Sequence, residues 1–400
     1  MQPLQGKTVV LGVCGSISSY KAADLASKLV QAGAQVDVIL TAAAREFLTP
    51  LTFHSLTGRA VSGDMFSETE TQEAHVHLAR AADLVIIAPA TATTMARLAQ
   101  GLADEMLSLT VLATTAPVLI APAMDAQMWA ADATQENIQT LRRRGVAFVG
   151  PMEGRLASGH VGLGRLAEPE DIVGAAKHLL GANGDLAGTH VVVSAGGTRE
   201  NIDPVRFISN ASSGKMGYSL AEAARDRGAR VTLVSTIDTL PVPYGVERVP
   251  VASVAQMREA VLSATADAQV LVMAAAMSDF RPADVGAQKI KRSEGGLVLT
   301  LVENEDFFHE VPDRVVKVAF AAETQDVIAN ARRKPLSHGH LDLICANDVS
   351  EEGSGFGTDT NRVSLIDAAG AVTDLPLLPK YEVAERIWDA VAGILKARGT

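Results

Sequence analysis

The feature that most constrains the fold is a regular alternation of short apolar runs with amphipathic helical stretches. Two parallel strands need a crossover connection, usually a helix, so this alternation is typical of a parallel sheet with helices on both faces. In the first half of the chain the helical stretches include Lys21–Ala32. The strand-like runs there are Thr8–Val13, Gln35–Leu40, Leu84–Ala88, Val118–Ala121 and Val146–Val149. The first half is therefore predicted to be a doubly wound α/β domain.

The same pattern restarts after Leu180–Thr189, a segment rich in glycine and small polar residues that predicts a linker. A helix is expected at Ser219–Arg227. The predicted strands are His190–Ser194, Arg230–Val234, Gln269–Ala274, Val315–Ala319 and Leu341–Ala346. Between Ala283 and Val302, KIKRSEGG lies between alternating apolar residues and predicts a basic hairpin or flap. We therefore predict two Rossmann-like domains, residues 1–180 and 190–400, with a linker at 181–189.

Composition restricts the class of protein further. The formal charge of −11 opposes the broad phosphate attraction of nucleic-acid binding, so no nucleic-acid partner is expected. No apolar run approaches the roughly 18 residues of a membrane span, and the N-terminus lacks the features of a signal peptide. Cys14 and Cys345 lie far apart, which supports neither a disulfide framework nor a zinc site. We expect a cytoplasmic protein that does not associate with membranes.

Hydroxyl-rich loops follow two strands of the first half. GVCGSISSYK at Gly12–Lys21 and APATATT at Ala88–Thr94 offer hydroxyls and open amides at the sheet edge where such folds bind ligands. The first loop alone can equally be an ordinary strand-to-helix connection. It also departs from the Gly-x-Gly-x-x-Gly fingerprint, which argues against an NAD dehydrogenase. Together the loops indicate a mononucleotide such as FMN.

Three further features complete this pattern. His75 and His77 precede a strand, and their spacing does not decide which of them is a surface histidine. PAMD ends at Asp125, and GRLASGHVGLGR at Gly154–Arg165 is typical of a glycine-rich flap. With GSISSYK and APATA, these features resemble the flavin-dependent cysteine decarboxylases, in particular the decarboxylase half of bacterial bifunctional coenzyme A enzymes. That resemblance implies a flavodoxin-like flavoprotein domain.

The resemblance also implies roles for individual residues. His75 is implied as the catalytic base, and FMN is implied to lie between the protomers of a trimer. The residues implied to contact FMN are Gly15, Ser16, Ile17, Thr41, Ala90 and Thr91.

Two residues closest to the chemistry depart from the family pattern, in which asparagine stands for Asp125 and cysteine for Ser158. A serine hydroxyl is a far poorer acid than a thiol, so Ser158 is not expected simply to replace the proton donor. Our hypothesis is that His160, two residues along the flap, donates the proton. The alternative is a solvent-facing histidine. Asp125 is either protonated or orients a histidine.

The densest motif is GGTRENIDPVRFISNASSGKMG, at Gly196–Gly217. Its two initial glycines let the backbone approach a ligand, and SSGK places hydroxyls and amides at a helix start. Arg206 suits a phosphate or carboxylate, the alternative being a surface ion pair, and Asn210 can donate and accept toward an acyl phosphate. Further on, Asp279 suits a nucleotide with its magnesium, and the flap lysines Lys289 and Lys291, with Arg292, suit phosphates.

In order along the chain, this motif, AAAMSDFRP, KIK, FAAET and LDLICANDV resemble the bacterial phosphopantothenate–cysteine ligases. The resemblance implies CTP as activator, with 4'-phosphopantothenate and cysteine as substrates and an acyl cytidylate as intermediate. Asn210 is then implied to hold the acyl cytidylate, and Asp279 and Lys289 to contact the triphosphate and its Mg²⁺. The implied substrate and nucleotide site further includes Arg206, Ala275, Ala276, Asp306, Phe307, Phe308, Phe320 and Lys334. Where relatives often have a second lysine, this chain has His338-Gly339-His340.

The two resemblances imply that the halves catalyse consecutive steps of one pathway, so a bifunctional coenzyme A enzyme is the predicted function. One alternative is an active ligase fused to an impaired or regulatory flavin domain, because of Asp125 and Ser158. Another is a flavin-binding scaffold protein, against which the ligase motifs argue. The family also implies a homo-oligomer, a dodecamer built from decarboxylase trimers and ligase dimers.

Overall fold

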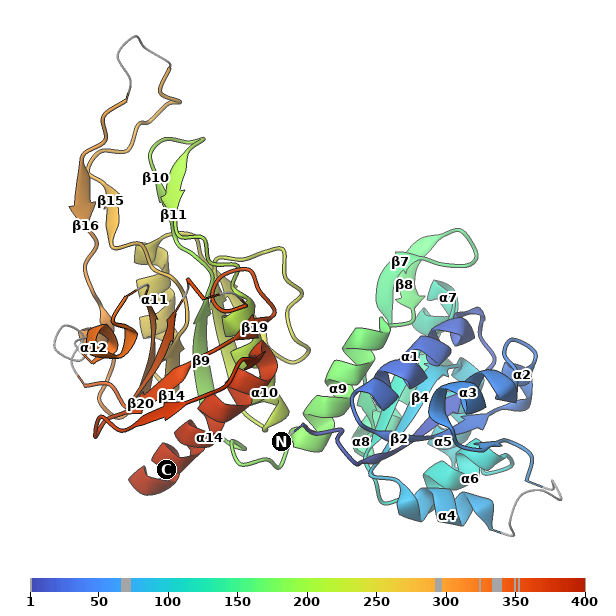
Figure 1. Ribbon diagram of the computed structural model, residues 1–400. Helices are drawn as coiled ribbons and strands as arrows, with labels where there is room; N and C mark the ends of the chain where they lie inside the picture. The colour runs from blue at the N-terminus through green and yellow to red at the C-terminus, as the bar shows by residue number, and fades with distance from the viewer. Residues whose placement is uncertain are drawn as a thin grey trace. The chain divides into compact units, whose positions relative to one another are not determined.

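The structure, a computed structural model, describes residues 2–65, 73–291, 297–323, 325–332, 340–348, 350–351 and 353–399. The chain divides into two compact units, Met1–Gly181 and Ala182–Thr400, which Figure 1 shows in blue to green and in green to red. Of the predicted residues, Arg292, Lys334, His338 and Gly339 lie outside the described part.

The first unit is built on a six-stranded, fully parallel sheet in the order β3-β2-β1-β4-β5-β6. The strands are β1 (Thr8–Val13), β2 (Gln35–Leu40), β3 (Val61–Ser62), β4 (Leu84–Ala90), β5 (Val118–Pro122) and β6 (Ala147–Phe148). All seven residues of β4 are buried, as expected for a strand covered on both faces. The predicted doubly wound sheet is confirmed.

Helices cover both faces of this sheet. The helices α1 (Tyr20–Gln31), α3 (Pro50–Thr57) and α9 (Pro169–Gly181) pack together, and α5 (Ala92–Gln100) packs with α6 (Met106–Ala113) and α8 (Asp132–Arg143). The other helices described in this unit are η1 (Ile17–Ser19), α2 (Ala42–Arg45), α4 (Ala74–Ala81) and α7 (Ala126–Ala130). The predicted flap is an antiparallel hairpin of β7 (Met152–Arg155) and β8 (Val161–Arg165).

The second unit has an eight-stranded sheet in the order β13-β12-β9-β14-β17-β18-β20-β21. The first six strands are parallel and the last two run antiparallel to their neighbours. They are β9 (His190–Ala195), β12 (Arg230–Ser235), β13 (Glu247–Pro250), β14 (Val270–Met273), β17 (Val316–Glu323), β18 (Leu343–Asp348), β20 (Ser364–Asp367) and β21 (Val372–Asp374). The second predicted Rossmann-like sheet is therefore confirmed, with an antiparallel extension at one edge.

Two layers cover this sheet. The helices α10 (Lys215–Asp226) and α14 (Lys380–Arg398) lie side by side on one face around the fully buried Trp388 (Figure 1). The opposite face carries α11 (Val254–Ala264), α12 (Val327–Ala331) and the short helix η2 (Phe308–Glu310). In the described part of the chain, no helix is long and apolar enough to cross a membrane.

Three short antiparallel pairs extend from the second unit. They are β10 (Arg199–Asn201) with β11 (Phe207–Ser209), β15 (Phe280–Pro282) with β16 (Leu301–Glu303), and β19 (Thr360–Asn361) with β22 (Leu378–Pro379). The β15–β16 pair is the base of the predicted basic hairpin, and it projects from the sheet beside β10–β11 (Figure 1). We call these two strand pairs, together with the described residues of the segments that connect their strands (202–206, 283–291 and 297–300), the arm.

Part of the predicted linker packs on the second unit. Leu186 is fully buried, its N–H donates to the Arg227 carbonyl at 3.1 Å, and Asp185 forms an ion pair with Arg227. The end of the predicted linker is therefore packed and hydrogen-bonded to the second unit just before β9 begins.

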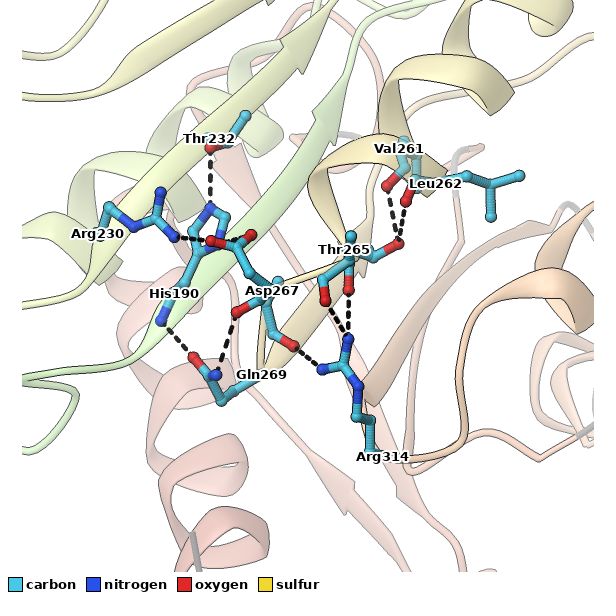
Figure 2. Close-up of polar contacts among 11 residues, drawn as sticks. His190, Arg230, Thr232, Val261, Leu262, Thr265, Asp267, Gln269 and Arg314 are labelled. Atoms are coloured by element: carbon cyan, nitrogen blue, oxygen red, sulfur yellow. Dashed lines mark hydrogen bonds and ion pairs between the residues drawn. The ribbon is translucent and has the colours of Figure 1, made fainter.

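A cluster of hydrogen-bonded polar side chains lies at the amino-terminal edge of the eight-stranded sheet (Figure 2). The ring of His190 is hydrogen-bonded to Asp267 Oδ1 and to Thr232 Oγ1, both at 3.0 Å. Asp267 also pairs with Arg230, and Arg314 donates to the carbonyls of Thr265, Ala266 and Ala268. The polar groups at this edge are thus paired with each other or with backbone.

Candidate active sites

The carboxyl-terminal edge of the eight-stranded sheet carries a cavity of about 410 Å³. Its walls come from the β9–α10 connection, the first turn of α10, the segment after β14, and residues of β17 and β18. The residues of the predicted substrate and nucleotide site that line it are Asn210, Ala275, Ala276, Asp279, Phe308 and Phe320. The fold thus brings residues of four of the quoted motifs together at one edge, where open α/β sheets bind ligands, while KIK does not line the cavity.

Glycines allow these walls to approach closely. Gly196, directly after β9, has a φ of +91°, and a Cβ atom there would lie 2.2 Å from Thr236 Oγ1. In the first turn of α10, a Cβ at Gly217 would lie 2.6 Å from Ala195 Cβ. The start of α10 therefore lies directly on the end of β9, and Ser212–Lys215 line the cavity there. The amide groups and positive dipole end of such a helix start favour a phosphate.

Asn210 links the two central walls of the cavity. Its side-chain amide donates to the carbonyls of Ala276 at 3.2 Å and Met277 at 2.9 Å. The Ala276 N–H donates to the Gly196 carbonyl at 2.8 Å, and the Ala275 N–H donates to Ser194 Oγ at 3.0 Å. Asn210 therefore holds the alanine segment against the glycine turn and also lines the space between them.

Arg206 is placed in an ion pair within the arm. Its guanidinium contacts the buried carboxylate of Asp203 and donates to the Ile290 carbonyl at 2.7 Å, while the Ile290 N–H donates to Asp203 Oδ2 at 3.1 Å. The guanidinium and the backbone N–H groups hold the pKa of Asp203 well below its usual range. Of the two sequence interpretations of Arg206, the structure therefore matches the ion pair, which ties the basic hairpin to the β10–β11 turn.

Other predicted ligands also lie outside the cavity lining formed by the described residues. Phe307 is 1 % exposed and packs in the hydrophobic core with α11, so it is a core residue rather than a cavity residue. Asp306 Oδ1 accepts from the Phe308 N–H at 3.0 Å and so starts the short helix η2. Lys289 is exposed on the arm.

The cavity includes residues that the sequence did not single out. Asn361, Phe356 and Lys380 line it, as does Asn347 from the end of β18. Asn347 lies within a quoted motif, so its signal was present. Lys380 gave no local signal, because a single lysine at the start of an amphipathic helix is ordinary in a sequence; only the fold buries it.

In the first unit, the predicted flavin-contacting residues follow β1, β2 and β4 along one sheet edge. Ser16 caps η1 by accepting from the Ser18 N–H, Thr41 caps α2 through Ala44, and Thr91 caps α5 through Thr94. A Cβ at Gly15 would lie 2.4 Å from Ala43 Cβ, so the first two loops are in close contact. These loops thus present three helix starts side by side at the carboxyl-terminal edge.

Two other residues of this edge are Ile17 and Cys14. The Ile17 side chain is 61 % exposed in its loop, as a residue open to a ligand requires. Burial raises the pKa of the Cys14 thiol to about 11, which keeps it protonated and excludes it as a nucleophile.

The flap hairpin lies against the segment that follows β5. The Met124 N–H donates to the Gly164 carbonyl at 3.0 Å, and a Cβ at Gly164 would lie 2.2 Å from the Met124 carbonyl oxygen. At the tip, the Ser158 hydroxyl donates to Asp125 Oδ2 at 2.9 Å. Gly162 and Gly164 of the predicted glycine-rich flap therefore have a packing role, since they let the hairpin dock on this segment.

The environment of Asp125 decides between the two sequence interpretations of its charge. Its carboxylate accepts from the Gln127 N–H at 3.0 Å and from Ser158, and these bonds, with a smaller effect of His160, lower the pKa of Asp125. Asp125 is therefore ionised at neutral pH, against the interpretation of a protonated carboxyl. The Ser158 hydroxyl is already donated to Asp125.

His75 lies in the first turn of α4, which leads into β4. Because α4 runs back across the parallel sheet to the start of β4, its first turn lies at the carboxyl-terminal edge, the edge of the three capped loops. His75 is half-buried and His77 is exposed. This difference favours His75 over His77 as the functional histidine.

Two α/β units, one with three capped helix starts at one sheet edge and one with a cavity at the carboxyl-terminal edge of its sheet, are typical of a two-domain nucleotide-binding enzyme. Comparison with known proteins identifies the family. The flavoprotein family matches residues 1–181, and the DNA/pantothenate metabolism flavoprotein C-terminal domain family matches residues 186–395.

Full-length relatives agree with both matches. The chain is 47% identical over 403 residues to the coenzyme A biosynthesis bifunctional protein CoaBC of Bacillus subtilis, covering 99% of each chain. It is 42% identical over 396 residues to the protein of that name from Escherichia coli K12, covering 97% of each. A crystal structure of the C-terminal domain of a coenzyme A biosynthesis bifunctional protein CoaBC is 36% identical, with a TM-score of 0.46, and covers 53% of this chain and 98% of that one. The chain belongs to the family of bifunctional coenzyme A biosynthesis enzymes, which confirms the predicted family and class of enzyme.

Proposed function

We propose that the second unit joins 4'-phosphopantothenate to cysteine with CTP as activator. The substrate carboxylate attacks the α-phosphate of CTP, releasing pyrophosphate and forming an acyl cytidylate, and the cysteine amine then displaces CMP. The observation that carries this proposal is the single cavity in which Asn210, Asp279 and the start of α10 meet. The helix start suits the phosphates, Asn210 suits the acyl phosphate, and the aromatic rings of Phe308 and Phe320 suit the base.

The cavity fits Mg²⁺ only when the triphosphate of the nucleotide supplies part of its coordination. Among the described residues, no group of three or more His, Cys, Asp or Glu side chains is arranged to hold a metal ion. Asp279 is the carboxylate in the cavity lining. Since Mg²⁺ is commonly held by one or two carboxylates together with substrate phosphates, we assign Asp279 as its protein ligand. The exposed Lys289 on the arm is assigned to the triphosphate by family resemblance.

We also propose that the first unit decarboxylates 4'-phosphopantothenoylcysteine to 4'-phosphopantetheine with FMN. When bound, the flavin supplies a reversible electron acceptor, which lets the carboxylate leave with its electrons delocalised. The loops fit such a group because three helix starts and the exposed Ile17 lie at one edge, and Gly15 leaves no room for a side chain. Gly15, Ser16, Ile17, Thr41, Ala90 and Thr91 would hold it.

In this reaction we assign His75 as base and His160 as the donor of the final proton. The Ser158 hydroxyl donates to the ionised Asp125, so it is poorly placed to donate to the substrate. His160, two residues further along the same hairpin, lies near enough to this carboxylate to contribute to the lowered pKa of Asp125. His160→Ala is expected to lower decarboxylation at least about tenfold and to leave ligation unchanged, with His54→Ala as the matched exposed-histidine control. Unchanged decarboxylation in His160→Ala would remove this assignment.

The test of both activities is a product assay on the full chain with CTP, cysteine and 4'-phosphopantothenate. Formation of phosphopantetheine, together with a flavin absorption spectrum of the purified protein, supports both proposals. Accumulation of phosphopantothenoylcysteine supports the alternative of an active ligase with an impaired first unit. That alternative is disfavoured by the similarity of the whole chain to relatives named as bifunctional coenzyme A biosynthesis proteins.

We further propose that the enzyme is a homo-oligomer, a dodecamer of decarboxylase trimers and ligase dimers. What supports self-association of the second unit is the apolar surface of the arm, where Val205 is 58 % exposed, Phe207 47 %, Phe280 48 % and Leu301 44 %. Large exposed apolar groups of this kind mark interaction surfaces. Mass measurement in solution tests the proposal, and a monomer would contradict it.

A further inference from the structure

A buried lysine supports the cavity from the side of α14. Lys380, the first residue of that helix, is 5 % exposed. Its ammonium group lies 3.2 Å from the Gly355 carbonyl, 2.5 Å and 3.1 Å from the carbonyl and hydroxyl of Thr358, and 3.0 Å from the Thr360 carbonyl. Burial and the nearby ammonium of Lys215 lower the pKa of Lys380 to about 8. The four oxygens all belong to one loop, Gly353–Asn361.

A lysine is a costly residue at this position if it only starts a helix. The positive end of the helix dipole opposes a cation in the first turn, and burial opposes any charge. The ammonium group is retained there by the loop oxygens, since an ammonium with three donors can satisfy several carbonyls at once. The side chain of Lys380 therefore organises the loop rather than the helix.

Hydrogen bonds rather than apolar packing hold this loop, and several of them lie within it, such as those from the Thr358 and Thr360 hydroxyls to the carbonyls of Thr360 and Gly353. Gly353, Gly355 and Gly357 have φ angles of +80°, +92° and +82°, the left-handed region that glycine adopts most easily. The buried Asn361 accepts from the Ser354 hydroxyl at 2.9 Å and from the Gly355 N–H at 3.3 Å. Glycines provide no side chains for packing, so polar bonds must hold this part of the loop in place.

A second lysine holds the loop from the start of α10. Lys215 donates to the Gly357 carbonyl at 3.0 Å and to Asp359 Oδ1 at 2.7 Å. The two lysines thus come from the first residues of two helices that lie side by side, and both line the cavity. The loop segment between them carries Phe356.

The face that this loop gives to the cavity suits a nucleobase. Phe356 is 43 % exposed and lines the cavity together with Phe320, Asn347 and Asn361. Aromatic faces stack on bases, and amide side chains donate and accept hydrogen bonds at base edges. A displaced loop would remove one of these aromatic faces without changing the phosphate-binding helix start.

We propose that Lys380 is a positioning residue for the nucleotide: its ammonium group holds the Gly353–Asn361 loop as a wall of the cavity, and Phe356 transmits this effect to the bound base. The inference rests on the proposed function of the cavity as the CTP site. It adds a determinant of nucleotide affinity that lies outside the catalytic groups.

The test is steady-state ligase kinetics of the full chain, measured as pyrophosphate release. Lys380→Met is expected to raise the KM for CTP at least about tenfold, with the KM for cysteine and 4'-phosphopantothenate and the saturated kcat changed less than about threefold. Lys396→Met, an exposed lysine of the same helix, is the matched control and should behave as the unmodified protein. A change in kcat with an unchanged KM for CTP would overturn the proposal.

A double-mutant cycle shows whether the effect passes through the loop. If it does, Phe356→Ala combined with Lys380→Met raises the KM for CTP little more than Lys380→Met alone; fully additive effects would overturn this route. If Lys380→Met does not fold, Thr358→Val removes the hydroxyl that accepts from Lys380 and also donates to the Gly355 and Thr360 carbonyls. A rise of about threefold in the KM for CTP then supports the loop as a determinant of nucleotide affinity, and no change overturns the proposal.

The outcomes separate this inference from the proposed function. Absence of CTP-dependent pyrophosphate release by the unmodified protein counts against the proposed ligase. Normal release with the same KM for CTP in Lys380→Met and in the unmodified protein counts against the positioning role alone.

Discussion

The two edges of the eight-stranded sheet carry similar polar residues but differ in what those residues contact. At the amino-terminal edge, His190, Asp267 and Arg230 satisfy each other, and both ring nitrogens of His190 have protein partners (Figure 2). At the carboxyl-terminal edge, Asn210 and Asp279 line a cavity of about 410 Å³. Residue type alone therefore does not mark a functional site. A histidine hydrogen-bonded to an aspartate and a threonine has the composition of a catalytic group, but at this edge it stabilises the fold.

The largest effect is expected from removing charge at the cavity edge. Asp279→Asn keeps the shape of the side chain but removes the carboxylate assigned to Mg²⁺, so the ligase kcat/KM should fall at least about a hundredfold. Thermal unfolding should be unchanged, because Asp279 is exposed. The measurement is pyrophosphate release over a range of Mg²⁺ concentrations.

The matched control for this change is Asp284→Asn, an exposed aspartate a few residues further along the same segment. It should leave both the rate and the Mg²⁺ dependence unaltered. Equal losses in the two variants would mean that net charge, rather than the cavity position of Asp279, matters.

The next largest effect is expected at the amino-terminal edge of the sheet, where a substitution should change the stability of the second unit. His190→Ala removes two hydrogen bonds and a buried ring, so the free energy of unfolding of the second unit should fall by about 2–3 kcal/mol. The KM values for CTP and cysteine should not change. In a Trp129→Phe background the buried Trp388 is the remaining one of the chain's two tryptophans, so its fluorescence reports the unfolding of this unit.

If His190→Ala lost ligase activity but not stability, the distinction between the two edges would be wrong, because a functional group would then lie at the amino-terminal edge. Arg258→Ala is a suitable control, since its ion pair with Glu310 lies on the exposed surface of the same unit and should contribute little.

The sequence predicted the positions of the strands more accurately than the contacts between side chains. The predicted strands Thr8–Val13 and Gln35–Leu40 match the observed strands to the residue, because a strand buried on both faces is predominantly apolar. Asp37 is the polar exception within β2, and it pairs with Arg59. The family motifs also predicted six of the cavity residues. What local sequence cannot encode is which neighbour a side chain meets.

Three residues show this limit. Phe307 and Phe308 are adjacent, identical and buried in the same core, yet Phe308 also lines the cavity and Phe307 does not. Arg206 meets Asp203 because a tight turn brings the two together, with the Arg206 N–H donating to Asp203 Oδ1 at 2.9 Å. Lys380 becomes part of the cavity only because a loop preceding it in the sequence folds back over its ammonium group.

The smallest effect concerns the pH dependence of the amino-terminal edge. Burial lowers the pKa of His190 in the folded protein below its value in the unfolded chain, with the Arg230 guanidinium contributing and Asp267 opposing. As the pH falls through about 6.5, the unfolded chain therefore takes up the proton first, and the second unit should lose less than about 1 kcal/mol of stability between pH 7.5 and 5.5. The lowered pKa of Asp267 acts in the same direction, but only nearer the range in which carboxylates titrate.

His190→Gln separates the histidine from other groups, because it keeps a hydrogen-bonding side chain but does not titrate. Trp388 fluorescence melts at the two pH values should show the difference in the unmodified protein and lose it in His190→Gln. Ligase kinetics should keep the same pH profile in both proteins, because the two edges lie at opposite ends of the strands. A pH profile of ligation that changes with His190 would instead mean that the edges are coupled through β9, whose first residue is His190 and whose last precedes the glycine turn of the cavity.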